Sequence, residues 1–253
     1  SAMTAASHLA MVQGAFAQAG SFSSSAVELA RQAGAEVVLG DALMTQGLVL
    51  LRQDDVQTAK QPFEESLALA RVSGRRQRVA IVTRALGAIA QREGNVARGM
   101  ELIEESVAIH QELHDLWELS TDYLSLGLLA NQRGEQAQAK RYFRDSLRLA
   151  QRMGETDKIA YLLDVLGCLA VSGEDYKRAA HLFVAADALW GTVEVKSFRR
   201  TVEVAFPDND REMRTRCEVA AREVLGGEWS VVQRAVAAMS LDEVAAYALA
   251  ESG

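Results

Sequence analysis

The apolar residues of this chain recur at steps of three and four, the spacing that places them on one face of an α-helix. One such run consists of Val79, Val82, Leu86 and Ile89. Gly94 follows this run, and glycine is favoured where a helix stops and the chain reverses. The pattern therefore predicts a succession of short helices joined by glycine-containing turns.

The spacing of these runs predicts helices in pairs. We expect the first helix of each pair at about 36–53, 75–93, 115–133 and 155–172. The second helices are expected at about 55–73, 95–113, 135–153 and 174–190. A shorter, degenerate leading pair is expected at about 4–19 and 22–33, because Gly14 and Gly34 are only 20 residues apart.

The chain also repeats itself every 40 residues. The repeated glycines are Gly47, Gly87, Gly127 and Gly167. A small residue follows each of them by twelve positions, namely Ala59, Gly99, Ala139 and Ala179. Four positions further on are Phe63, Ile103, Phe143 and Phe183. Gly34, Gly74 and Gly154 each end a repeat, and His114 occupies the equivalent position between Gly74 and Gly154. This periodicity predicts a repeat array over residues 4–191, divided into 4–34, 35–74, 75–114, 115–154 and 155–191.

The repeated glycines fall inside predicted helices, where each costs about 1 kcal/mol relative to alanine. Packing must compensate for this loss, and a missing Cβ lets a partner helix approach closely. We expect the phenylalanines to fill the wider space between repeat units. On this basis Gly127→Leu should push the helices apart and lower the melting temperature.

Composition agrees with an all-α fold. The 253-residue chain has two prolines and is rich in alanine, the best helix former. A net charge of −7 argues against a dominant nucleic-acid-binding role, because binding phosphates requires a basic surface. No apolar run approaches the roughly 18 residues of a membrane span. Cys168 and Cys217 are too few for a disulfide framework and suit a reducing cytoplasm, where we expect the protein to reside.

The middle of two repeats resembles the tetratricopeptide repeat (TPR), whose pattern includes Leu-Gly and then Ala-x3-Phe. The matching residues are Leu126, Gly127, Ala139 and Phe143, and then Leu166, Gly167, Ala179 and Phe183. Tyr123 is the only aromatic residue at the family's Trp position, the terminal Pro is absent, and the period is 40 rather than 34. The resemblance implies an all-α solenoid, a right-handed superhelix of antiparallel helix pairs.

In the resembled family the first helices line a concave face that binds partners. Carried over by register from the repeated glycines, the candidate contact residues are Asp41, Met44, Arg84, Gln91, Thr121, Asn131, Tyr161 and Asp164. This mixed polar and apolar surface suits an extended peptide, a partner helix or a modest ligand. Several of the apolar positions on this face could equally pack between neighbouring helices.

The 40-residue period stops after Trp190, and we expect residues 192–253 to form a helical C-terminal capping segment. Within it, residues 192–207 have mixed periodicity and are expected to be irregular or weakly helical. Helices are expected at about 208–225, 228–239 and 241–251. Ser240 and Glu243 have the spacing of a capping box at the start of the last helix.

The string from Leu225 to Glu251 resembles the end of the repeat region in large bacterial ATP-binding transcription regulators of the LuxR type. That resemblance implies an ATPase module before the repeats and a DNA-binding module after them. Neither lies in this chain, which has no G-x-x-x-x-G-K-[ST] motif. The chain is therefore expected to be a sensor module that contacts DNA only through modules outside it. Ser1-Ala2-Met3 is typical of residues left by tag cleavage and is excluded from this interpretation.

The expected partner is a protein, a peptide or a small-molecule inducer. The alternative is a free-standing scaffold that joins two proteins, and a hydrolase with a dispersed site is a third hypothesis. We expect no enzyme, because no catalytic motif or phosphate loop is visible, and no cofactor. His110 and His114 lie one turn apart, but zinc requires three or four ligands, so we expect no metal.

Three further features have both a functional and a structural interpretation. A basic stripe could bind an anion, although a solvated helix face is favoured; it consists of Lys140, Arg141, Arg144, Arg148 and Arg152. The arginine cluster of Arg71, Arg75, Arg76 and Arg78 has the same two interpretations. Cys168 is favoured as a small buried apolar residue, with a redox switch to Cys217 as the less favoured alternative.

Overall fold

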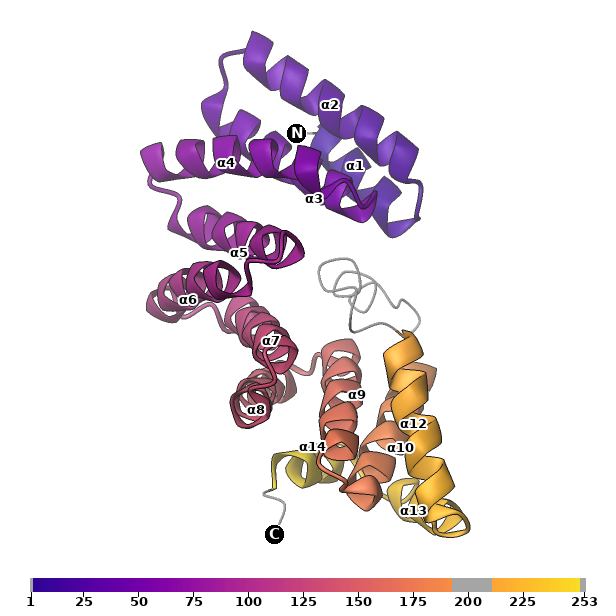
Figure 1. Cartoon of the computed structure of the whole chain (residues 1–253). Coiled ribbons are helices and arrows are strands. Elements are labelled where there is room, and N and C mark those ends of the chain that lie inside the picture. The colour runs from indigo at the N-terminus through magenta and orange to yellow at the C-terminus, as the bar shows by residue number, and fades with distance from the viewer. Residues whose placement is uncertain (1, 193–210, 251–253) are drawn as a thin grey trace. The chain divides into compact units, whose positions relative to one another are not determined.

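The computed structural model describes residues 2–192 and 211–250, and these residues form helices joined by turns (Figure 1). The predicted all-α class is therefore confirmed for the described part of the chain. The predicted irregular segment 192–207 lies outside the described residues, apart from Thr192, which ends a helix.

The first ten helices form five consecutive pairs. The bounds of the first three pairs are α1 (Ala2–Val12) with α2 (Phe16–Gln32), α3 (Glu36–Arg52) with α4 (Val56–Val72), and α5 (Arg76–Arg92) with α6 (Val96–Glu112). The next two pairs are α7 (Leu116–Gln132) with α8 (Gln136–Met153), and α9 (Thr156–Ser172) with α10 (Tyr176–Thr192). The described C-terminal helices are α12 (Arg211–Leu225), α13 (Glu228–Val236) and α14 (Leu241–Leu249). From α3 to α10 each helix begins and ends within two residues of its predicted bounds.

The chain divides into two compact units, which we describe separately. Unit 1 covers residues 1–114 and contains the first three helix pairs. Unit 2 covers residues 115–253 and contains the fourth and fifth pairs together with α12, α13 and α14.

The turns of the repeat array have one residue in the left-handed region every 20 positions. Six of these residues are glycines, namely Gly14, Gly34, Gly74, Gly94, Gly134 and Gly154. The other three are Asp54, His114 and Glu174, with φ angles of 65°, 54° and 59°. A left-handed residue after a helix lets the chain reverse while backbone amides bond to the last carbonyls. His114 therefore has the same left-handed backbone conformation as the turn glycines whose place it takes in the repeat pattern.

The expected bounds of the leading pair are wrong. The chain turns at residues 13–15, because Gly14 has a φ of 77° and lies between α1 and α2. Gly14 precedes Gly94 by two periods of 40 residues and so corresponds to a turn glycine, not to a mid-helix glycine. The 20-residue interval from Gly14 to Gly34 is therefore the normal distance between successive turns.

The mid-helix glycines allow close approach within each pair, as expected. A Cβ added to Gly47 would lie 2.7 Å from the Phe63 ring, and one added to Gly167 would lie 2.6 Å from the Phe183 ring. Gly127 meets the Phe143 ring in the same way. The prediction that the phenylalanines fill the space between repeat units is wrong, because each ring lies against the glycine of its own pair.

The leading pair carries two serines at the corresponding positions. Ser7 precedes Gly47 by 40 residues, and Ser23 precedes Phe63 by 40 residues. Both serines are buried, and the Ser7 hydroxyl donates a hydrogen bond to the carbonyl of Ala19 at 2.9 Å. At the two positions that carry a glycine and a large side chain in the later pairs, the leading pair thus carries two small residues.

The described C-terminal helices pack on the last two helix pairs of unit 2. α12 contacts α9 and α10, α13 contacts α10, and α14 contacts α8. The capping box is confirmed: the Ser240 amide donates to Glu243 Oε2 at 2.7 Å, and the Glu243 amide donates to Ser240 Oγ at 3.3 Å.

The expectation of a solvated basic face on α8 is wrong in part. Arg144 donates a hydrogen bond to the Leu249 carbonyl at the end of α14. The Gln151 side chain donates to Asp242 at 3.1 Å. The face of α8 that carries the basic stripe is therefore partly covered by α14, because arginine satisfies the carbonyls left unpaired at a helix C-terminus.

Candidate functional site

The first helices of consecutive pairs lie side by side within each unit. In unit 1, Thr45 of α3 is 3.3 Å from the His8 ring of α1, and Arg75, just before α5, bonds to Asp41 of α3. In unit 2, Lys158 of α9 donates to Thr121 of α7 at 3.2 Å. Within each unit, we call the surface that carries the candidate residues the first-helix surface of that unit; it lies on α3 and α5 in unit 1 and on α7 and α9 in unit 2.

In unit 1 the candidate residue Asp41 belongs to a charged group. Its Oδ1 is 2.9 Å from Nη1 of Arg75 and 2.9 Å from Nε of Arg78, and its side chain is 31% exposed. Arg78 also donates to the sulfur of Met44 at 2.8 Å. Burial, together with the positive charge of Arg78, lowers the pKa of His8. Two cations thus converge on a carboxylate that is still partly accessible to solvent.

The four unit 1 candidates differ in exposure. Asp41 and Arg84 are half-buried, whereas Met44 and Gln91 are buried at 8% and 5% exposure. Asp41 and Arg84 are therefore partly accessible to solvent, whereas Met44 and Gln91 are almost completely covered.

In unit 2 the candidates Thr121 and Asn131 are half-buried. Thr121 lies beside Lys158, which is buried, with Nζ 2.5 Å from Oε2 of Glu155 and 4.6 Å from the centre of the Trp117 ring. An ammonium at this distance from an aromatic face is attracted to it. Lys158 thereby fixes the start of α9 against α7.

Lys158 was not among the predicted residues, although the sequence carries a signal for it. Arg78, Glu118 and Lys158 occupy the same position in three successive repeats. A charged residue that recurs at one position of a helix, three residues into its first turn, is a candidate for contact with the neighbouring first helix.

The other two unit 2 candidates are buried. Tyr161 is 2% exposed and Asp164 is 3% exposed. Asp164 Oδ2 accepts a hydrogen bond from the Trp190 indole at 2.9 Å, and Oδ1 accepts one from Arg214 Nε at 3.1 Å. Direct contact between a partner and Asp164 therefore requires α12, which carries Arg214, to move away.

Arg214 joins α12 to the fifth helix pair through several contacts. Besides Asp164, its guanidinium contacts Asp187 at 2.6 Å and also Glu218. The same group lies 5.2 Å from the centre of the Phe183 ring, which packs on Gly167. Burial opposes the charge of Arg214, but the nearby carboxylates of Asp164, Asp187 and Glu218 raise its pKa. The first-helix surface of α9 is thus occupied by a helix of the same chain.

The histidines and the arginine cluster have structural roles in the described residues. His110 is buried, with Nδ1 3.3 Å from the Ser106 hydroxyl, and His114 forms a turn. Across 2–192 and 211–250, no group of three His, Cys, Asp or Glu side chains is placed to hold a metal ion. The arginines of the cluster have carboxylate partners: Arg71 with Glu105, Arg75 and Arg78 with Asp41, and Arg76 with Glu112.

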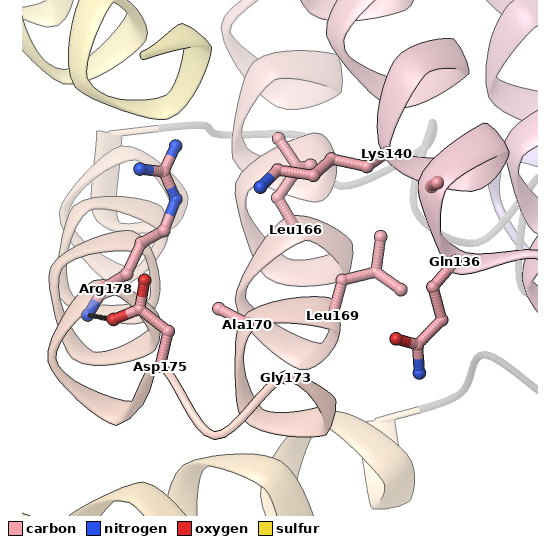
Figure 2. Close-up of a pocket in the computed structure, with 9 residues that line it drawn as sticks. Gln136, Lys140, Leu166, Leu169, Ala170, Gly173, Asp175 and Arg178 are labelled. Atoms are coloured by element: carbon pink, nitrogen blue, oxygen red, sulfur yellow. Dashed lines mark hydrogen bonds between the residues drawn. The ribbon is translucent and has the colours of Figure 1, made fainter. Parts of the chain in front are cut away.

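A cavity of about 310 Å³ lies between α8, α9 and α10 in unit 2 (Figure 2). Leu166 and Leu169 line one side, and Lys140 extends toward Leu166 from α8, while Arg178 lies on α10. The Arg178 guanidinium donates to the carbonyls at the end of α14, including that of Ala248 at 2.8 Å. The positive charge of Arg178 is therefore directed at α14. The side of the cavity lined by Leu166 and Leu169 is apolar.

Comparison with known proteins identifies the fold. No family model matches the chain, and no curated protein matches it in sequence. Among solved structures, BtubC (BKLC) from P. vanneervenii has a TM-score of 0.62 at 18% identity, covering 89% of this chain and 94% of its own. The fold is TPR-like.

Two further solved structures agree with this TPR-like fold. PilF of Pseudomonas aeruginosa has a TM-score of 0.55 at 20% identity, over 94% of this chain and 96% of its own. A Podosopora anserina protein described as a kinesin light chain with nearly identical TPR-like repeats has a TM-score of 0.52 at 12% identity, over 85% and 94%. The predicted all-α, TPR-like solenoid is thus confirmed.

The structure also bears on the membrane. Within the described helices, none combines the length and the apolar character that crossing a bilayer requires.

Proposed function

We propose that this chain is a non-catalytic protein-interaction module whose units each bind a helix or an extended peptide on their first-helix surface. The observation that carries the proposal is the packing of α12 on α9, where Arg214 forms a partly buried ion pair with Asp164. A surface that already holds one helix through a charged contact has the chemistry to hold another. Helix recognition of this kind uses apolar anchors spaced along one face of the bound helix.

The other repeats supply the contacts for a partner. Asp41 and Arg84 in unit 1, and Thr121 and Asn131 in unit 2, are half-buried on helices equivalent to α9. They combine charge and hydrogen-bonding capacity with apolar neighbours, as a peptide-binding surface requires. We further propose that Tyr161 and Asp164 take part only when α12 is displaced.

A finer proposal is that the module is the sensor of a bacterial ATP-dependent transcription regulator in the cytoplasm. It rests on the resemblance of residues 225–251 to that family. Binding of a protein, a peptide or a small-molecule inducer would favour one arrangement of the repeats, and the ligand's differential affinity would then bias the neighbouring modules. DNA contact would belong to modules outside this chain.

The alternative is a TPR-like scaffold that joins two proteins. The gene on either side of this sequence separates the two proposals. An ATPase module upstream and a helix-turn-helix module downstream would support the sensor. A gene that encodes neither of these modules would support the scaffold.

Peptide binding tests the interaction surface itself. In the full chain, Arg214→Glu removes the cation and adds a negative charge among the carboxylates of Asp164, Asp187 and Glu218, which should release the chain's own α12. A fluorescent peptide with the sequence of residues 211–225 should then bind this chain saturably, as measured by fluorescence anisotropy. Because Arg214 supplies the contact with Asp164, the peptide carrying Arg214→Glu should bind at least tenfold more weakly.

The matched control is the same peptide carrying Arg216→Glu. Arg216 lies two residues away on α12, and its side chain is 70% exposed. This peptide should bind about as well as the unsubstituted one. Equal affinity of all three peptides, or no saturable binding up to about 1 mM, would contradict the proposed surface.

A further inference from the structure

The chain has two cysteines, and the fold brings them together although 49 positions separate them. Cys168 lies on α9 and Cys217 on α12, which packs on α9, and each thiol shifts the pKa of the other. Both are free thiols; Cys168 is buried and Cys217 is half-buried. The contact continues the one between Asp164 and Arg214, since Asp164 precedes Cys168 by one turn and Arg214 precedes Cys217 by one turn.

The two thiols have unequal acidity. The hydrogen bond from the Cys168 thiol lowers the pKa of Cys217 to about 7, and the positive charge of Arg216 acts in the same direction, although burial opposes both. The same hydrogen bond raises the pKa of Cys168, as do burial and the carboxylate of Asp164. Cys217 is therefore the thiol that ionises and attacks an oxidant, because the thiolate is the nucleophilic form. A thiol with a pKa near the ambient pH combines thiolate content with intrinsic reactivity.

We propose that Cys168 and Cys217 are a redox modification site at which a hydroperoxide forms a disulfide that fastens α12 to α9. The inference goes beyond the proposed function and does not depend on it, because it concerns a contact within this chain. A cysteine that only fills space needs no second thiol beside it. Here the only other cysteine of the chain, on another helix, is its neighbour.

The chemistry balances in two steps. The Cys217 thiolate attacks one peroxide oxygen, the O–O bond breaks, and the leaving oxygen takes a proton; Cys217 becomes a sulfenic acid while the peroxide is reduced. The Cys168 sulfur then attacks the Cys217 sulfur, the S–O bond breaks, and the leaving hydroxyl takes the Cys168 proton as water. With hydrogen peroxide, two thiols and one peroxide give one disulfide and two waters.

The test is oxidation of the full chain with hydrogen peroxide followed by mass spectrometry. The expected product is a monomer lighter by two hydrogens. Trypsin without reductant should then release residues 159–177 joined to residues 217–222, and a reductant should separate them. Cys168→Ala should stop at oxygen adducts on Cys217, whereas Cys217→Ser should leave Cys168 largely unmodified.

A second variant links the reaction to the helix contact. Arg214→Ala keeps both cysteines but removes the ion pair that holds α12 on α9, so the intramolecular disulfide should form at least fivefold more slowly. Three results would overturn the inference: oxygen adducts without a link in the unsubstituted chain, disulfides only between chains, or linking at the same rate in Arg214→Ala.

Discussion

At the scale of single residues, the repeat is built on a contact between a glycine in one helix and a large side chain in the next. Gly87 meets Ile103, and the other three repeated glycines meet phenylalanine rings. An added Cβ at Gly87 would also lie 3.0 Å from the Gly99 carbonyl, which cannot move as a side chain can. The loss of helix propensity at each glycine is thus compensated by packing that no other residue allows.

Two glycines of α3 give a matched test of this contact. Gly47→Ala should lower the free energy of unfolding by about 1–3 kcal/mol, because the new methyl group overlaps the Phe63 ring. Gly40→Ala should leave it unchanged or raise it by up to about 1 kcal/mol, because the nearest atom to its added Cβ is 3.5 Å away. Urea unfolding followed by circular dichroism measures both. Equal effects of the two substitutions would contradict the packing.

The sequence was sufficient to predict the importance of these glycines, because their periodic spacing and helical context are both visible in it. It was not sufficient to predict which surface the phenylalanine rings touch. A ring sixteen residues from a glycine can face its own pair or the next one, and the pattern alone does not distinguish the two. Burial likewise divides the predicted contact residues: Asp41 stays accessible, whereas Asp164 does not.

At the scale of helices and helix pairs, the residues at the contact change together. Where the first helix carries glycine, the second carries phenylalanine or isoleucine, and where α1 carries Ser7, α2 carries Ser23. The side chains at the two positions therefore occupy one shared volume. A large residue in the second helix fills this volume when the first helix carries glycine.

The leading pair tests this shared volume. Ser23→Phe alone should destabilise the chain by about 1–3 kcal/mol, because the ring overlaps Ser7. Ser7→Gly alone should also destabilise it, because it removes the hydrogen bond to Ala19 and a better helix former. In the double variant the ring faces a glycine, so the two changes should couple favourably by about 1–2 kcal/mol.

The measurement is a double-mutant cycle from urea unfolding of the four chains. Additive losses would mean that the two positions do not share a volume. The bounds of α1 and α2 show why this pair is the hardest to predict. It lacks the mid-helix glycine and the phenylalanine, and the pattern alone does not distinguish Gly14, a turn glycine, from a glycine inside a helix.

At the scale of the whole molecule, α12 changes how the proposed binding surface of the fifth repeat should be understood. Asp164 and Arg214 are 50 residues apart, and no local pattern relates them. The sequence predicted a helix near α12 and a candidate residue at Asp164, but their meeting depends on the path of the chain between them. Contacts of this kind arise from tertiary packing and leave no periodic signal.

Hydrogen–deuterium exchange of the full chain is the direct test of this docking. Arg214→Ala leaves Asp164 buried without its cation, which is strongly destabilising, whereas Arg216→Ala alters an exposed side chain of the same helix. Amides of residues 211–225 should exchange at least tenfold faster in Arg214→Ala than in the unsubstituted chain, and at an unchanged rate in Arg216→Ala. If Arg214→Ala left the exchange of these amides unchanged, α12 would not be held on α9 by this contact, and it could not serve as evidence that the surface binds helices.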